Sequence, residues 1–220
     1  MQAINVIDLV KRGFNRAIEN IGLFLGAELS AAGLFFVVIS ILGILSVLIS
    51  RTFGITFPLK SAPPVWGWLF MAVIFVGFLV LIDIMAMGFI RLSLRIEDGQ
   101  AAGIRTLFEA KHLVWRYIGV SFLYKMIMLG GSMLFVVPGI IWGIQFSFAT
   151  RVLVDREVGI IDALRASSRL TEGHKLNLFA IYLILFILNG IGSALYGIGM
   201  LFVFPIGLMI STAAYRRLAS

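Results

Sequence analysis

The sequence predicts an all-α fold, a polytopic membrane bundle of six transmembrane helices with amphipathic helices on the cytoplasmic side. Three observations lead to this prediction. Apolar residues make up 60% of the 220 residues and charged residues only 13%, whereas soluble domains contain about 45–50% and about 25%. The apolar residues form long unbroken runs, unlike the polar–apolar alternation of a membrane β-barrel. The basic residues concentrate in the loops that six spans would place on one side of the membrane.

This composition excludes several classes of protein. A chain with a mean hydropathy of +1.05 cannot hide its apolar surface in one soluble core, which argues against a soluble enzyme, a disordered chain and a nucleic-acid-binding module. The chain has no cysteine, so it forms no disulfide and no thiolate metal site. Its net charge of +7 follows from its basic loops and indicates no nucleic-acid partner. The expected partner is the lipid bilayer.

The first, second and last apolar runs divide into four spans. The first two, near 21–50 and 63–90, are each one tilted helix, because a span needs about 20 apolar residues. The last run covers 176–215 and would be roughly 60 Å long as one helix. It is therefore predicted to form two spans, near 176–194 and 199–215, joined at a glycine-rich turn.

The third apolar run is also too long for one span. As a single helix it would extend roughly 51 Å, against a hydrocarbon core of about 30 Å. Pro138 and Gly139 supply a break, because proline disfavours helix in the residue before it and glycine readily adopts turn conformations. We predict a tight turn over 136–140, with these two residues at its centre, between spans near 117–137 and 139–154.

The distribution of basic residues favours six spans over five. If both termini are cytoplasmic, the inside segments hold 15 of the 18 lysines and arginines, and the outside segments hold only Arg51 and Lys60. The remaining cation, Lys125, lies within a span. Five spans would place two strongly basic loops on opposite sides of the membrane, against the positive-inside rule. The whole chain is therefore interpreted as one transmembrane domain with both ends inside.

Three segments on the cytoplasmic side have amphipathic helical spacing: 4–18, 102–112 and 160–170. In the first, part of a surface helix over 1–20, apolar residues recur with helical periodicity and basic residues lie elsewhere. Such helices lie in the plane of the bilayer surface. They are either simple connectors or binding elements for anionic lipid head groups or a soluble partner. Because each precedes two spans, a threefold repeat of surface helix, span, turn and span is a further hypothesis.

Residues 136–179 carry a motif that resembles a known family. A Pro-Gly turn is followed by a span, an acidic residue and the pattern Ala-Leu-x-x-Ser-x-x-Leu-x-x-Gly. The matching residues are Pro138, Gly139, Asp155, Ala163, Leu164, Ser167, Leu170 and Gly173. The motif resembles an uncharacterised family of bacterial six-span integral membrane proteins, related to the membrane domain joined to some glycerophosphodiester phosphodiesterases. The resemblance implies a bacterial cytoplasmic-membrane protein and brings no assigned activity.

The Ala-Leu-x-x-Ser motif has two interpretations. In the first, small residues let the surface helix sit close against neighbouring span ends, and Gly173 ends the helix. In the second, the motif recognises a substrate. The first needs no ligand and is the simpler of the two.

Three charges interrupt the apolar runs: Glu28, Asp83 and Lys125. At 1.5 Å per residue, all three lie roughly 10–13 Å deep in the cytoplasmic half. Because an unpaired charge is costly in lipid, we predict that Lys125 pairs with Asp83, Glu28 or both in the bundle interior. The pair would either fix helix packing or form a polar site that holds a proton or a polar substrate.

No pattern in the sequence indicates catalysis. His112 and His174 lie in different loops and at no metal-ligand spacing, so we expect no catalytic residue, metal or cofactor. Two functions remain. One is a non-enzymatic multi-pass protein acting in membrane homeostasis or as an assembly component. The other is a small transporter or channel that uses the intramembrane charges.

The predicted topology can be tested with reporter fusions. Alkaline phosphatase fused after Lys60 should be active, because that loop lies outside the membrane in the six-span arrangement. The same reporter fused after Ser220 should be inactive, and a fluorescent protein at that position should fluoresce. Activity of the phosphatase at both positions would contradict the topology.

Overall fold

The computed structural model of the chain describes residues 5–52, 65–194 and 198–219, and these residues contain helices and no strands. Six of the helical segments are long and apolar enough to cross a membrane. The predicted all-α, six-span class is therefore confirmed, and the chain is a membrane protein. Residues 1–4 of the predicted surface helix, residues 63 and 64 of the second predicted span, and Lys60 lie outside the described residues.

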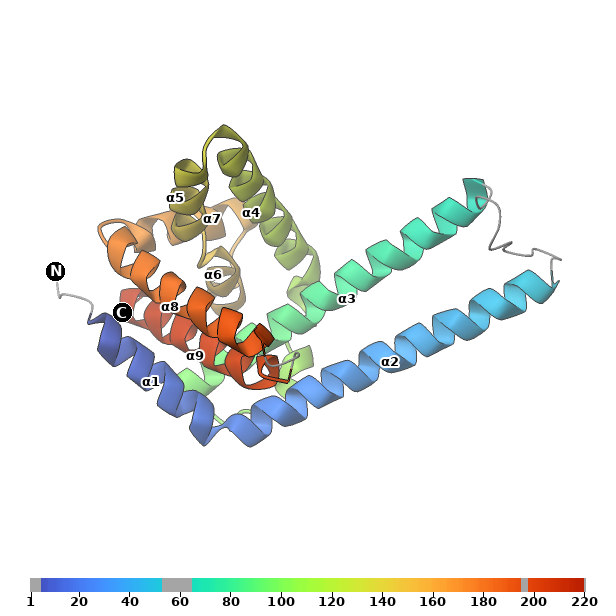
Figure 1. Cartoon of the computed structure of the whole chain (residues 1–220), viewed down its shortest axis with the longest axis horizontal. Helices are drawn as coiled ribbons and strands as arrows, with labels where there is room; N and C mark the ends of the chain where they lie inside the picture. The colour runs from blue at the N-terminus through green and yellow to red at the C-terminus, as the bar shows by residue number, and fades with distance from the viewer. Residues whose placement is uncertain (1–4, 53–64, 195–197, 220) are drawn as a thin grey trace.

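The helices follow the predicted order along the chain (Figure 1). Their bounds are α1 (Val6–Glu19), α2 (Ile21–Thr52), α3 (Val65–Glu97), η1 (Ile104–Phe108), η2 (Lys111–Leu113), α4 (Val114–Leu134), α5 (Val136–Gln145), α6 (Ala149–Arg156), α7 (Ile160–Thr171), α8 (Lys175–Ala194) and α9 (Met200–Ala219). The elements η1 and η2 are short 3-10 helices. This order is compatible with three units of surface element and two spans, and the repeat itself stays a prediction.

Four of the predicted spans match α2, α3, α8 and α9, with one clear difference in length. Helix α3 runs to Glu97, beyond the predicted end at 90. Its last two turns are charged, and their charges are paired within the protein. Arg95 lies 2.6 Å from Glu109 and Glu97 lies 2.8 Å from Arg12. The helix therefore continues past its apolar part because other elements bind its end.

The turn between the third and fourth spans was predicted at the wrong residues. The helical path breaks at Phe135, which has an extended backbone (φ −162°, ψ 153°), and α5 begins at Val136. Pro138 lies inside the first turn of α5, where its missing N–H costs nothing. Gly139 is also helical, and it lets α5 approach α4: a Cβ on Gly139 would lie 3.0 Å from Ser132 Cα. Both residues therefore lie within α5, after the turn, and not in the turn itself.

Two other elements differ in the structure from the sequence-based prediction. The fourth span, predicted near 139–154, is two helices, α5 and α6, separated by a turn at 146–148. The predicted amphipathic helix over 102–112 consists of η1 and η2. The backbone of η1 packs directly on α3 at Gly88, where a Cβ would lie only 2.8 Å from Leu107 Cα. Close backbone contact with α3 is thus what holds this segment.

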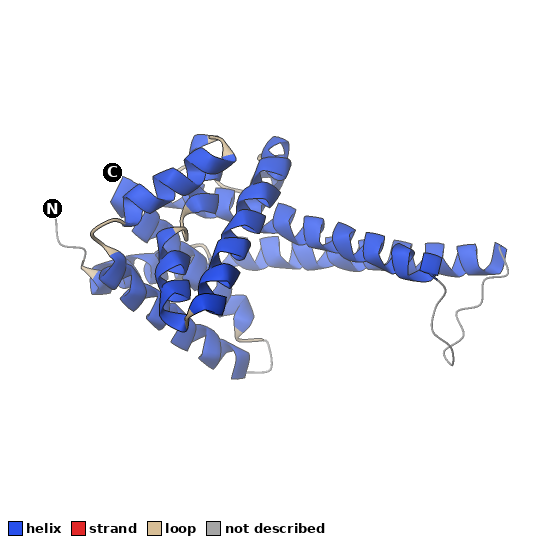
Figure 2. Cartoon of the chain, turned by 90° about the horizontal axis from the view of Figure 1, so that it is seen from above, coloured by secondary structure: helices blue, strands red, loops and turns tan. Residues whose placement is uncertain are grey.

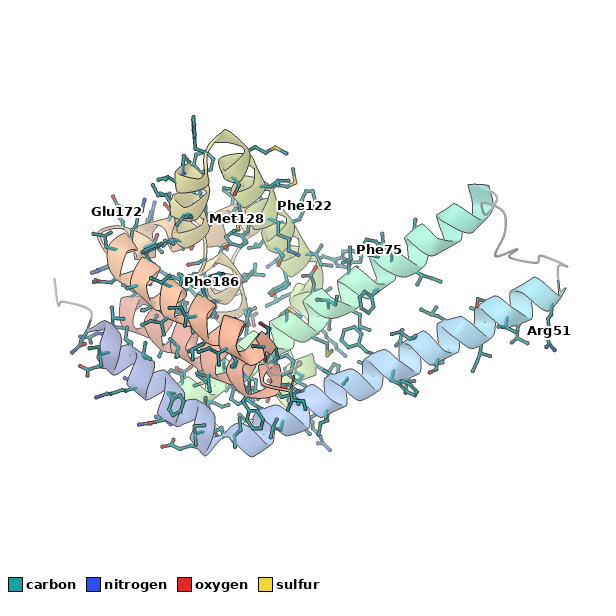
Figure 3. The ribbon with its side chains drawn as sticks, viewed as in Figure 1. Arg51, Phe75, Phe122, Met128, Glu172 and Phe186 are labelled. Carbon is teal, nitrogen blue, oxygen red and sulfur yellow. The ribbon has the colours of Figure 1, made fainter. Side chains whose placement is uncertain are left out.

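Helices α2 and α3 extend together beyond the rest of the molecule in both views (Figure 1, Figure 2). They meet through an edge-to-face contact of Phe35 and Phe78, with ring centroids 5.4 Å apart. Arg51 near the tip of α2 and Glu172 after α7 mark opposite ends of the molecule (Figure 3). Only 6% of the apolar stretch of α2 is buried inside the protein, whereas 61% of the apolar stretch of α9 is buried. The core therefore surrounds α9, and most of α2 is left for lipid.

Helix α1 packs along α9 through a narrow face that contains one leucine and two small residues. Leu9, Gly13 and Ala17 are buried, at spacings of four residues. The Asn5 side chain accepts a hydrogen bond from the backbone N–H of Ile7 at 3.2 Å and caps the helix start. The large apolar residues Phe14 and Ile18 lie on the outer side of the helix. The apolar face of the sequence pattern is therefore divided: Val6 and Val10 pack partly against the core, whereas Phe14 and Ile18 do not.

Gly13 should be the residue on which the packing of α1 against α9 depends. A Cβ there would lie 2.5 Å from Ile210 Cα and 2.7 Å from Ile210 N. Gly13→Ala should therefore lower stability by roughly 1–3 kcal/mol, the usual cost of overpacking. Gly33→Ala in α2 is the matched control, since nothing lies within 4 Å of its Cβ position, and the better helix propensity of alanine should stabilise it by up to about 1 kcal/mol. If thermal unfolding in detergent shows that Gly13→Ala is as stable as Gly33→Ala, or more stable, the result would contradict this packing.

Candidate functional site

The structure brings together two of the three predicted intramembrane charges. Lys125 Nζ on α4 lies 3.8 Å from Asp83 Oδ1 on α3. The Asp83 side chain is 17% exposed and that of Lys125 is 69% exposed. The pairing of Lys125 with Asp83 thus forms, but the lysine lies on the outer surface. The prediction that this cation faces the bundle interior is wrong, because depth along a helix does not determine which side the residue occupies.

Glu28 does not join this pair. It lies on α2, and within the described part of the chain it has no ion-pair partner. Its Oε1 atom is inaccessible and has no hydrogen-bond partner there. The prediction of a joint site of Glu28, Asp83 and Lys125 is therefore reduced to the pair of Asp83 and Lys125.

A half-buried arginine, Arg151, packs against α9, although the predicted topology counts it among the basic residues of the inside segments. Arg151 on α6 donates a hydrogen bond from Nη2 to Ser211 Oγ on α9. Its guanidinium carbon lies 6.0 Å from the centre of the Phe148 ring, within reach of a cation–π interaction. Its Nε is inaccessible and has no hydrogen-bond partner among the described residues. No carboxylate pairs with it in the described part of the chain, so this cation is held by neutral polar groups.

Four tyrosines from three helices lie within electrostatic range of this arginine: Tyr117 and Tyr124 of α4, Tyr182 of α8 and Tyr215 of α9. The Tyr182 hydroxyl is inaccessible and, within the described residues, has no hydrogen-bond partner. Phenol oxygens can stabilise a guanidinium without neutralising it. The group is therefore a cationic, polar centre between α4, α6, α8 and α9.

Helix α7 supplies hydrogen-bond partners to the backbone at the break between α5 and α6. Ser167 Oγ donates to the Gln145 carbonyl at 3.0 Å and accepts from the Phe148 N–H at 3.2 Å. Thr171 Oγ1 donates to the same Gln145 carbonyl at 3.2 Å. Ser167 and Thr171 are fully buried. The serine of the Ala-Leu-x-x-Ser motif thus binds backbone groups that the break between α5 and α6 leaves without helical partners, which explains the motif without a substrate.

The side chain of Gln145 strengthens the same junction. Its Nε2 donates to Ser168 Oγ at 2.8 Å, and its Oε1 accepts from Lys175 Nζ at 3.1 Å. One glutamine therefore joins α5 to α7 and to the start of α8. Between α7 and α8, Gly173 adopts a left-handed backbone (φ 78°), as expected for the residue that ends α7.

Ion pairs join the ends of α3, α6 and α9. Arg216 on α9 lies 2.8 Å from Asp155 on α6 and 2.6 Å from Asp98 after α3. Tyr215 donates a hydrogen bond to Asp155 at 2.7 Å. The acidic residue of the family motif, Asp155, therefore anchors the last helix. A hollow of about 290 Å³ beside these residues is lined partly by Arg12, Glu97, Asp98 and Arg216. Its carboxylates are already paired with arginines, so it offers no free charge of either sign from these four residues.

The two histidines do not come together. His112 lies 3.3 Å from Glu157 at the end of α6, and His174 lines a separate hollow beside α7. Among the described residues, no group of three or more His, Asp or Glu side chains could hold a metal ion.

Comparison with known proteins gives distant relatives only. Over 150 residues, or 67% of its length, the chain is 28% identical to an uncharacterised protein of Mycobacterium bovis. It has the same identity over the same length to uncharacterised proteins from two strains of Mycobacterium tuberculosis. The match covers 46% of each relative, so the chain spans about half the length of the curated proteins it matches. No protein-family model matches the chain, and no solved structure matches it.

The pair of Asp83 and Lys125 should contribute measurably to stability. Lys125→Met leaves the mostly buried Asp83 without its cation and should cost roughly 1 kcal/mol, since the exposed lysine keeps the pair weak. The melting midpoint should fall by roughly 2–4 °C in a chain of this size. Adding Asp83→Asn to Lys125→Met should recover part of the loss. A double-mutant cycle with a coupling energy near zero would contradict the pair.

Proposed function

We propose that the protein is a non-enzymatic, multi-pass component of a bacterial cytoplasmic membrane, with both termini in the cytoplasm, acting in membrane homeostasis or as an assembly component. At the molecular level, its cytoplasmic helices bind anionic lipid head groups. The distribution of basic residues supports the orientation. The mycobacterial relatives and the resemblance of residues 136–179 to a bacterial family support the bacterial membrane.

The observation that carries this proposal is the two-sided character of α1. One side of the helix is held by α9 through Leu9, Gly13 and Ala17. The other presents Ile7, Phe14 and Ile18, which are 64%, 46% and 47% exposed. In water, such a ridge would be costly to expose. At the head-group boundary of a bilayer, it would be stabilised by burial among the acyl chains.

The charges of α1 fit the same position. Arg12 is bound to Glu97 of α3 at 2.8 Å and holds the helix to the bundle. Lys11 is exposed and Arg16 half-buried, and in the described part of the chain neither has an ion-pair partner. Basic residues near the surface of an anionic membrane contribute about 1 kcal/mol each to attraction. The helix therefore combines an apolar ridge with unpaired cations, as in-plane helices at anionic membranes do.

A single-cysteine probe tests this proposal directly, because the chain has no cysteine of its own. Phe14→Cys, labelled with an environment-sensitive fluorophore and reconstituted in nanodiscs containing phosphatidylglycerol, should report an apolar environment. Asn15→Cys, also exposed but outside the ridge, is the matched control and should report water. Equal, water-like emission at both positions would refute the placement of α1 in the interface.

Transport is the second candidate function, and the position of Arg151 is the observation that favours it. Ionisable residues between membrane helices commonly mark substrate pathways, and this cation has no ion-pair partner among the described residues. Uptake of an anion into proteoliposomes, lost in Arg151→Gln, would favour transport. No difference between protein-containing and empty liposomes would favour the non-enzymatic membrane component.

A further inference from the structure

We propose that the hollow between the end of α6, the outer side of α7 and the end of α9 binds one phosphodiester group, that of an anionic glycerophospholipid head group. This inference rests on the proposed function and names its ligand. The hollow has a volume of about 490 Å³, within the range of small-molecule sites. Three arginines line it: Arg156, Arg165 and Arg169.

These three arginines are unpaired, unlike those in the ion-pair cluster. Within the described part of the chain, none of their side chains has a hydrogen bond or an ion pair. By contrast, Arg12 and Arg216, which line the neighbouring hollow, both hold carboxylates. Guanidinium groups bind phosphate oxygens through two parallel hydrogen bonds. Three unpaired guanidiniums at one hollow are therefore a set of donors that lacks an acceptor.

Helix α7 is built so that two of these arginines, Arg165 and Arg169, lie on its side opposite the spans. Its inner side is fixed by Ser167 and Thr171, which bind the break between α5 and α6. Asp162, Arg165 and Arg169 follow the spacing of the opposite side, at intervals of three and four residues, and all three are exposed. The hydrogen bonds that hold the helix therefore also fix the backbone positions of Arg165 and Arg169 beside the hollow.

The charge of the hollow matches a singly charged ligand. Besides the three arginines, it is lined by Asp162 and Glu172, and by His174. With a neutral histidine, three cations and two carboxylates leave one net positive charge. A phosphodiester carries one negative charge, so it would neutralise the site. A polyphosphate or a doubly charged phosphate would bring more negative charge than the site can neutralise. The two carboxylates would repel the excess.

The apolar part of the lining favours a lipid over free phosphate. Ala166, Leu170 and Leu218 complete the wall, and α9 ends beside it. Glu172 lies at the turn into α8, at one end of the molecule (Figure 3). The hollow therefore lies where α8 begins and α9 ends. A head group can reach it from the bilayer surface with its glycerol against the apolar wall.

Lipid titration with native mass spectrometry of the detergent-solubilised protein tests the site. The wild type should bind phosphatidylglycerol at least tenfold more tightly than phosphatidylcholine, whose choline cancels the phosphate charge. Arg165→Gln with Arg169→Gln should weaken phosphatidylglycerol binding at least tenfold. Arg51→Gln, at the end of α2 far from the hollow and outside the cytoplasmic helices, is the control and should change it less than twofold. Glu172→Gln, which raises the net charge of the site, should strengthen binding.

Further measurements distinguish a lipid from free phosphate as the ligand. They also distinguish failure of this site from failure of the proposed function. Glycerol phosphate and inorganic phosphate should compete weakly, and competition as strong as that of the lipid would overturn the lipid ligand. Equal losses in the double variant and in Arg51→Gln would overturn the site. The fluorophore on α1 would still report the interface in that case, so failure of this inference is distinguishable from failure of the proposed function.

Discussion

The architecture depends on how the chain satisfies its own backbone at the break in the fourth span. In lipid, an unpaired N–H or carbonyl costs several kcal/mol, because no water is present to replace the lost hydrogen bond. The turn at 146–148 interrupts the helix between α5 and α6. Ser167 and Thr171 supply the missing hydrogen bonds. A break of this kind is tolerated in a membrane only where another element covers it, and α7 is that element.

The position of α7 has consequences on both of its sides. On the inner side, the covered break lets α6 carry Arg151 between α4, α8 and α9. On the outer side, the same helix holds Arg165 and Arg169 at the hollow beside α9. The two cationic features of the molecule, one among the membrane helices and one at their ends, therefore share a single structural cause.

The ends of the helices are joined by charges, while the long α2–α3 pair is left to the bilayer. Arg216, Asp98 and Asp155 connect α3, α6 and α9 through ion pairs shorter than 3 Å. Among the side chains of α2 that the structure describes, large apolar ones such as Phe36 and Ile44 are exposed. In the absence of a hydrophobic driving force between helices in lipid, the polar contacts at the helix ends stabilise the association of these spans together with close packing at small residues such as Gly139.

Composition and charge distribution alone were sufficient to predict the all-α class, six spans and their limits to within a few residues for α2, α8 and α9. This works because the hydrophobic thickness of a bilayer sets the length of a span, and both quantities are read along one dimension. Depth along the helix likewise indicated that Lys125 could reach Asp83, and the two do pair.

Only the tertiary structure decided which side of each helix faces the protein. Glu28 lies at a comparable predicted depth but does not join the pair, and the exposed lysine faces outward. Arg151 fell within the predicted fourth span and was still counted as a loop charge, because nothing local marks the break at 146–148. Pro138 suggested a turn that occurs at Phe135 instead, since proline is accommodated equally well in the first turn of a helix. Such choices depend on contacts between segments far apart in the chain, and local sequence patterns carry no information about those contacts.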